Sequence, residues 1–156
     1  MEEKLLTMDE NSGLICIASD HAGFPMKQFL KQKLSDSGYV VKDYGCYSEQ
    51  SVDYPDYIHP LAKSVDQGEC ERGIIICGSG NGAQMTANKY PNVRAALCWD
   101  AEQTRLARMH NDANVMSLPG RFVEFEESWR MTMIFLQTEF EGGRHTQRVE
   151  KISRIQ

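Results

Sequence analysis

The feature that most constrains the fold is a regular alternation of short apolar runs with stretches of helical periodicity. The runs at 14–19, 73–77 and 114–118 are apolar along most of their length and show little polar–apolar alternation. Such runs are typical of strands that are covered on both faces of a sheet. Because parallel neighbours need crossover connections, strands that alternate with helices predict a parallel sheet between two helical layers.

This pattern covers nearly the whole chain. We expect strands at 14–19, 39–44, 73–77, 93–99 and 114–118, and helices at 25–38, 53–68, from the glycine-rich turn to about 89, 101–109 and, as a pair, over 125–152. The expected fold class is α/β, a three-layer α/β/α sandwich with a five-stranded parallel, Rossmann-like sheet. The length of 156 residues suits a single domain over 14–156, and the polar segment 1–13 predicts a flexible N-terminal lead-in.

The helix expected after residue 124 is unusually apolar. Its main stripe and the apolar residues beside it are Phe125, Trp129, Met133, Leu136 and Phe140, with Met131, Ile134 and Phe135. Two interpretations stay open: a wide face on the domain core, or a surface that packs partly on a second subunit.

Charge and cysteine usage narrow the classes of partner. The net charge is −5 and the isoelectric point about 5.4, which argues against general affinity for nucleic acid or anionic membranes. No run approaches the roughly 20 apolar residues of a membrane helix. The five cysteines are odd in number and form no CxxC pair, which predicts reduced thiols in a cytoplasmic protein and no zinc site.

Parallel sheets bind ligands beyond the carboxyl ends of their strands, where this chain has a glycine-rich turn. Gly78, Gly80 and Gly82 follow the strand at 73–77 and can point successive backbone N–H groups at an anion. A Walker loop is excluded because no Lys-Ser/Thr pair follows. A dinucleotide fingerprint remains an alternative, since the turn fits G-x-G-x-x-A and Asp100 follows at suitable spacing.

Several chemically capable side chains are predicted near this edge or in neighbouring loops. Cys77 precedes the glycine turn, where a helix N-terminus favours a thiolate, although buried cysteine is commonly a small packing residue. Asp20 and His21 end the first strand and suit either hydroxyl and phosphate binding or helix capping. His110 and Asn111 precede the fifth strand and suit either a site or a simple turn.

A local cationic site is predicted near the C-terminus. Arg144 and Arg148 are one helical turn apart and follow two glycines. Two guanidinium groups on one helix face have a good shape for phosphate, whereas the alternative is a solvated helix face.

Taken together, these motifs resemble the type B ribose-5-phosphate isomerases and their galactose-6-phosphate isomerase relatives. The resemblance covers about 14–152. It depends on SDHAGF (19–24), VDYPDY (52–57), ICGSGNG (76–82), ANK (87–89), RMHNDANV (108–115) and GGRHTQRVEKI (142–152). The order and spacing of these motifs together are highly specific.

The resemblance implies roles for individual residues. The family's base is either a cysteine that ends the third strand or a glutamate after the glycine loop; here Cys77 is present and Ala83 occupies the glutamate position. The implied catalytic residues are Cys77 as base, Ser79 as proton relay, His110 with Asp20 for ring opening, and Asn111 for the oxyanion. The implied substrate- and phosphate-binding residues are His21, Gly78, Gly80, Asn81, Gly82, Arg121, Arg144 and Arg148.

The resemblance also implies partners. It predicts interconversion of ribose 5-phosphate and ribulose 5-phosphate through an enediolate, with no metal and no cofactor. It further predicts a homodimer or dimer of dimers whose C-terminal helix contributes to the interface, with His110 and the two arginines reaching the neighbouring subunit's site. Galactose 6-phosphate or allose 6-phosphate are alternative substrates, and a nucleotide-binding module or a non-catalytic sugar-phosphate sensor are alternatives of another class.

Overall fold

The protein, described by a computed structural model over residues 13–155, is built around a five-stranded sheet in the order β2-β1-β3-β5-β4. The strands are β1 (Leu14–Ser19), β2 (Val40–Asp43), β3 (Arg72–Cys77), β4 (Ala95–Leu97) and β5 (Val115–Pro119). Every neighbouring pair is parallel. The expected five-stranded α/β sheet is therefore confirmed. Apart from Gly13, the expected N-terminal lead-in lies outside the described residues.

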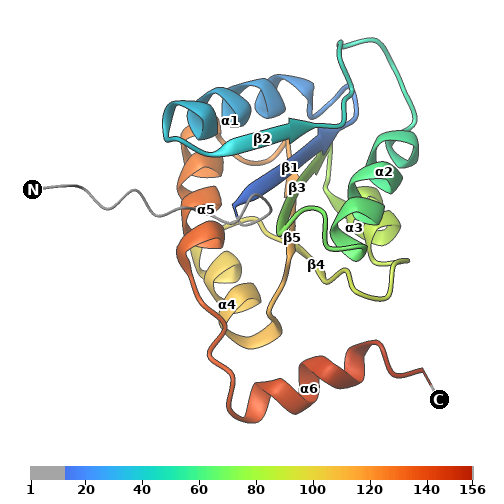
Figure 1. Ribbon diagram of the computed structural model, residues 1–156. Coiled ribbons are helices and arrows are strands. Elements are labelled where there is room, and N and C mark those ends of the chain that lie inside the picture. Colours follow the sequence, from blue (N-terminus) through green and yellow to red (C-terminus); the bar gives the residue numbers. More distant parts are fainter. Residues whose placement is uncertain (1–12, 156) are drawn as a thin grey trace, which may run out of the picture.

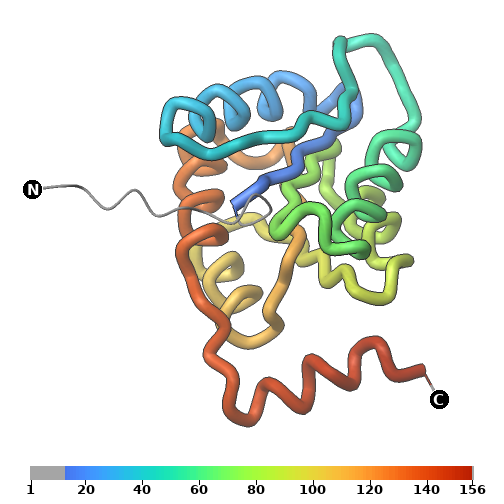
Figure 2. Tube along the Cα trace, viewed as in Figure 1, coloured from blue at the N-terminus to red at the C-terminus, as the bar shows by residue number. Residues whose placement is uncertain are grey.

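Helices cover both faces of this sheet (Figures 1 and 2). The bounds are α1 (Phe24–Asp36), α2 (Tyr54–Asp66), α3 (Asn81–Ala87), α4 (Ala101–Asn111), α5 (Phe125–Gln137) and α6 (Arg144–Ile152). Two apolar cores result, one beneath α1, α4 and α5 and the other beneath α2 and α3. In β3, Ile74 and Ile76 face the first core and Ile75 the second, which explains why this strand is apolar at successive positions.

The buried face of α5 differs from the stripe expected from the sequence. Its fully buried apolar residues are Met131 and Phe135, whereas Phe125 is exposed and Phe140 lies beyond the end of the helix. Trp129 packs against the core while partly exposed. The core therefore uses a face rotated from the predicted one. Two small polar residues also lie on this face, and they can be buried because their hydroxyl groups donate to backbone carbonyls of the same helix.

Two of the five cysteines are neighbours in the fold, which the sequence did not predict. The sulfur atoms of Cys16 in β1 and Cys70, just before β3, lie against each other next to Ser64 of α2. The reduced state of the five thiols stays a prediction. The two residues are 54 positions apart, and only the pairing of β1 with β3 makes them neighbours. Cys46, Cys77 and Cys98 are free thiols.

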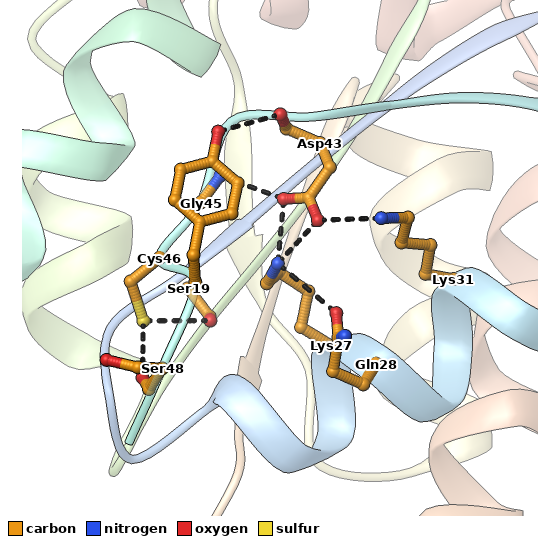
Figure 3. Close-up of polar contacts among 9 residues, drawn as sticks. Ser19, Lys27, Gln28, Lys31, Asp43, Gly45, Cys46 and Ser48 are labelled. Atoms are coloured by element: carbon orange, nitrogen blue, oxygen red, sulfur yellow. Dashed lines mark hydrogen bonds and ion pairs between the residues drawn. The ribbon is translucent and has the colours of Figure 1, made fainter. Parts of the chain in front are cut away.

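A buried ion pair anchors the turn after β2 (Figure 3). The Lys27 ammonium group of α1 is fully buried and donates to both carboxylate oxygens of Asp43, at 2.7 and 2.6 Å. Lys31 donates to the same carboxylate at 3.1 Å, and so does the backbone N–H of Gly45 at 2.8 Å. Burial raises the pKa of Asp43, but these hydrogen bonds outweigh burial, so the pKa lies below its ordinary value of 3.8.

We expect Asp43→Asn to destabilise the protein by about 3–5 kcal/mol, because it leaves the Lys27 charge buried without a partner. Lys31→Ala is the matched control: it removes a more exposed partner of the same carboxylate and should cost less than about 1 kcal/mol. Urea unfolding at neutral pH measures both. Equal stability of Asp43→Asn and wild type would contradict this assignment.

The lowered pKa of Asp43 also gives a direction for the pH dependence. The folded state holds the carboxylate deprotonated more strongly than the unfolded state does, so the stabilisation is complete above the ordinary pKa and is lost as pH falls through the folded-state pKa. This acid-dependent component of stability should be absent from the Asp43→Asn variant.

No helix between residues 13 and 155 is both long and apolar enough to cross a lipid bilayer.

Candidate active site

The carboxyl edge of the sheet carries the glycine loop that follows β3. Cys77 is only 4% exposed, and its Sγ accepts a hydrogen bond from the backbone N–H of Gly80 at 3.2 Å. Gly80 has a φ of 78°, and a Cβ there would lie 2.5 Å from Leu97. The hydroxyl of Ser117 donates to the Gly80 carbonyl at 2.7 Å. The loop therefore needs glycine, and it aims an N–H group at the sulfur, where negative charge would be stabilised.

The end of β1 lies beside this loop. The backbone N–H of Asp20 donates to the carbonyl of Ile76, the residue before Cys77. The Asp20 carboxylate accepts the N–H of Gly23 at 3.0 Å, which fixes its orientation at the start of α1. His21 Nδ1 accepts the N–H of Val52 at 3.1 Å, so the proton of a neutral ring is on Nε2. Asp20 and His21 therefore lie at the same sheet edge as Cys77, as the strand pattern predicted.

Arg121 covers the glycine loop from the turn after β5. Its backbone N–H donates to the Gly78 carbonyl at 3.1 Å, and its guanidinium lies 3.3 Å from where a Cβ of Gly78 would be. Ser79 Oγ accepts the N–H of Asn81 at 3.3 Å. The guanidinium group of Arg121 therefore lies against the glycine loop, and phosphate binding by this residue stays a prediction.

Sequence reasoning did not single out Tyr54, which bounds the other side of this loop. A Cβ on Gly82 would lie 2.4 Å from the Tyr54 ring, so the absence of a side chain at 82 is what lets the phenol approach. The VDYPDY motif that contains Tyr54 was the available signal, but its contact with the loop is not visible in sequence.

The other predicted residues gather at the end of α4 and on α6. His110, Asn111 and Arg148 line a cavity of about 350 Å³, together with His145. Arg144 and Arg148 are exposed, and neither forms an ion pair with any residue between 13 and 155. Arg148 lines the cavity, and an unpaired guanidinium group there can bind a phosphate.

Within one chain, the residues around Cys77 and the residues around His110 lie at opposite edges of the sheet. α4 begins after β4 at the carboxyl edge and returns over 11 residues, about 16 Å, to the amino edge. There the carbonyl of Asn114 accepts the N–H of Gly73, at the start of β3. His110 therefore lies near one end of β3 and Cys77 at the other. One chain does not bring the predicted base and the predicted ring-opening histidine together.

Sequence reasoning also missed the role of His145 beside His110. The two imidazole rings stack with centroids 4.3 Å apart and 15° between their planes, and Glu141 Oε2 lies 3.9 Å from His110 Nε2. Burial, followed by the nearby His110 and Arg144, lowers the pKa of His145. The glycine pair before α6, with φ angles of 71° and 56°, was the available signal that the chain bends here.

The dinucleotide alternative is not favoured by the structure. The Asp100 carboxylate, which such a site would use for a ribose hydroxyl, instead caps α4 by accepting the N–H of Gln103 at 2.7 Å.

Comparisons with known proteins agree with the motifs. A model of the Ribose/Galactose Isomerase family matches residues 15–152. Ribose-5-phosphate isomerase B of Escherichia coli is 39% identical over 142 residues, which cover 91% of this chain and 95% of that protein. A probable ribose-5-phosphate isomerase B of Mycoplasma pneumoniae is 44% identical over 139 residues, or 88% and 91% of the two chains.

Solved structures extend this similarity to the fold. The ribose 5-phosphate isomerase of Thermotoga maritima has a TM-score of 0.90 and 45% identity, covering 92% of this chain and 99% of that one. The Mycoplasma genitalium ribose-5-phosphate isomerase B, solved with bound ribulose 5-phosphate, has a TM-score of 0.88 and 41% identity, covering 92% and 95%. This chain therefore belongs to the ribose/galactose isomerase family.

Proposed function

We propose that this protein interconverts ribose 5-phosphate and ribulose 5-phosphate through an enediolate. The observation that carries the proposal is the placement of the free Cys77 thiol under the glycine loop, beside Asp20 and His21 at one sheet edge. The relative from Mycoplasma genitalium that holds ribulose 5-phosphate supports this choice of substrate.

The proposed chemistry uses one base and fixed hydrogen-bond donors. The Cys77 thiolate removes the proton from C2 of the open-chain aldose and returns it to C1, while Ser79 relays the hydroxyl proton between O1 and O2. Backbone N–H groups of the loop and the amide of Asn111 hold the oxyanion that develops, each worth about 3–4 kcal/mol when well placed. His110, with Asp20, opens the sugar ring.

This chemistry requires a second subunit, because His110 and Cys77 lie at opposite sheet edges in one chain. We propose a homodimer, alone or paired into a dimer of dimers, in which His110, Asn111 and the two arginines of the partner subunit complete each site. A two-fold axis would pair the two half-sites of each chain into two complete sites.

The C-terminal region supports this arrangement. α6 stands apart from the layers that cover the sheet (Figure 1), and His145 is its only buried residue. A groove of about 790 Å³ lies between its end and the edge formed by α3, β4 and α4. Its lining includes the exposed apolar side chains of Trp99, Ile152 and Ile155. Burial of this apolar surface by a second copy would stabilise the dimer.

We also propose a cytoplasmic location. Cys77 must remain a free thiol to act as a base, and a reducing compartment keeps functional thiols in that state.

A coupled assay with ribose, allose and galactose phosphates tests the proposed activity. We expect turnover to be fastest with the ribose 5-phosphate pair, with deuterium from heavy water incorporated at the carbon that exchanges. A thermal-shift measurement tests the alternative. A rise in the melting temperature with NAD but not with ribose 5-phosphate would overturn the proposal in favour of a nucleotide-binding module. Binding of ribose 5-phosphate without proton exchange would overturn it in favour of a sensor.

We expect Arg148→Ala to raise KM about ten- to hundredfold with a smaller change in kcat, because it removes a charge-assisted contact to the phosphate. Lys151→Ala is the matched control, since it removes a cation from the same helix one turn further on. Steady-state kinetics measures both. An effect of Arg148→Ala confined to kcat would contradict its role as a phosphate anchor.

A further inference from the structure

We infer that His110, Glu141 and His145 form a binding site for a Zn²⁺ ion. Each residue offers one ligand atom, and these atoms lie within 4.8 Å of one another. The three residues come from the end of α4, the loop before α6 and the first turn of α6. The backbone N–H of Glu141 donates to the carbonyl of Met109 at 3.1 Å, which holds the loop against the end of α4.

The unsatisfied nitrogen of His145 points to a ligand independently of this clustering. His145 is 5% exposed, and its Nε2 has no hydrogen-bond partner among residues 13–155. Buried polar atoms are nearly always paired, so a buried imidazole nitrogen without a partner calls for an explanation. A metal ion is one such partner, because a neutral imidazole offers it a lone pair.

The residue types suit zinc. Two histidines and one glutamate form a set that holds Zn²⁺ at about 2.0–2.2 Å while leaving a fourth position open. A metal lies in the plane of each ring that binds it, whereas the rings of His110 and His145 stack with their centroids 4.3 Å apart. Binding therefore requires a ring to rotate. The His110 side chain is 38% exposed and has room to turn out of the stack.

Neighbouring charges act in two directions. Arg144 and Arg148 repel a cation, while Glu141 attracts one. We therefore expect weaker binding than at a dedicated structural zinc site, with an anion able to occupy the fourth position beside the arginines.

A consequence for catalysis rests on the proposed function. If His110 opens the sugar ring, Zn²⁺ removes that group from the reaction and inhibits the enzyme. The site would then make isomerisation sensitive to free zinc.

Calorimetric titration of the full chain with Zn²⁺, in phosphate-free buffer, tests the site without using activity. We expect one ion per chain, and binding weakened about tenfold or more in both Glu141→Gln and His145→Ala. Glu141 is exposed, so its substitution keeps the test informative even if His145→Ala disturbs the fold. Absence of saturable binding to wild type, or binding by Glu141→Gln equal to wild type, would overturn the inference.

One control addresses other zinc ligands. His59→Ala removes an exposed histidine that contacts Tyr90, and the variant should bind Zn²⁺ like wild type. Loss of binding in this variant would place the ion elsewhere and overturn the site. Turnover of ribose 5-phosphate in the presence of a chelator tests the proposed function separately, so the two failures can be told apart.

Discussion

Cys77→Ala is expected to lower kcat at least about a thousandfold while ribose 5-phosphate still binds, because a general base contributes factors of this size to proton abstraction. Sγ of Cys77 accepts a hydrogen bond from the backbone N–H of Gly80 at 3.2 Å. Among the described residues, no other free thiol accepts a hydrogen bond from a backbone N–H group. Turnover in a coupled assay gives kcat, and calorimetry with ribose 5-phosphate gives the binding constant.

Cys98→Ala is the matched control for this result. Burial raises the pKa of the Cys98 thiol to about 11, so it stays protonated at neutral pH and cannot act as a base. The variant should retain kcat close to that of wild type. Unchanged turnover in Cys77→Ala, or an equal loss in Cys98→Ala, would remove the central assignment.

Mixing two inactive variants is expected to restore activity. Cys77→Ala and His110→Ala should each be nearly inactive, but their mixed dimer would contain one site with an intact Cys77 and the intact His110 of the partner subunit. Half of the dimers in an equal mixture are mixed, and half of their sites are intact, so about a quarter of wild-type activity should return. Refolding the two chains together and assaying turnover measures this.

A control mixture distinguishes shared sites from a gain in activity caused by refolding alone. Ser79 is in the same loop as Cys77, so a mixture of Cys77→Ala and Ser79→Ala leaves one damaged loop in each site and should recover nothing. If both mixtures stay inactive, the proposed arrangement of shared sites is wrong. This result does not depend on the zinc site, since the assays contain a chelator.

Local sequence patterns predicted most of the fold for a clear physical reason. Successive side chains of a strand point to opposite faces, so an uninterrupted apolar run such as that of β3 must be covered on both faces of the sheet. The helices between such strands provide the crossover connections that parallel pairing needs. The glycine turn was predictable because Gly80 adopts a positive φ that other residues rarely take. The buried face of α5 was not predictable, since it depends on the neighbouring helices and sheet.

The sequence by itself determined the parallel α/β sheet, the glycine loop with Cys77 at its base, and the identity of the candidate site residues. These follow from local periodicity and from backbone conformations that few residues can adopt. Only the tertiary structure decided that His110 and Cys77 lie at opposite edges, that Cys16 meets Cys70, and that His145 stacks on His110. Which of these residues become neighbours depends on how the helices return across the sheet, and local sequence patterns do not contain this information.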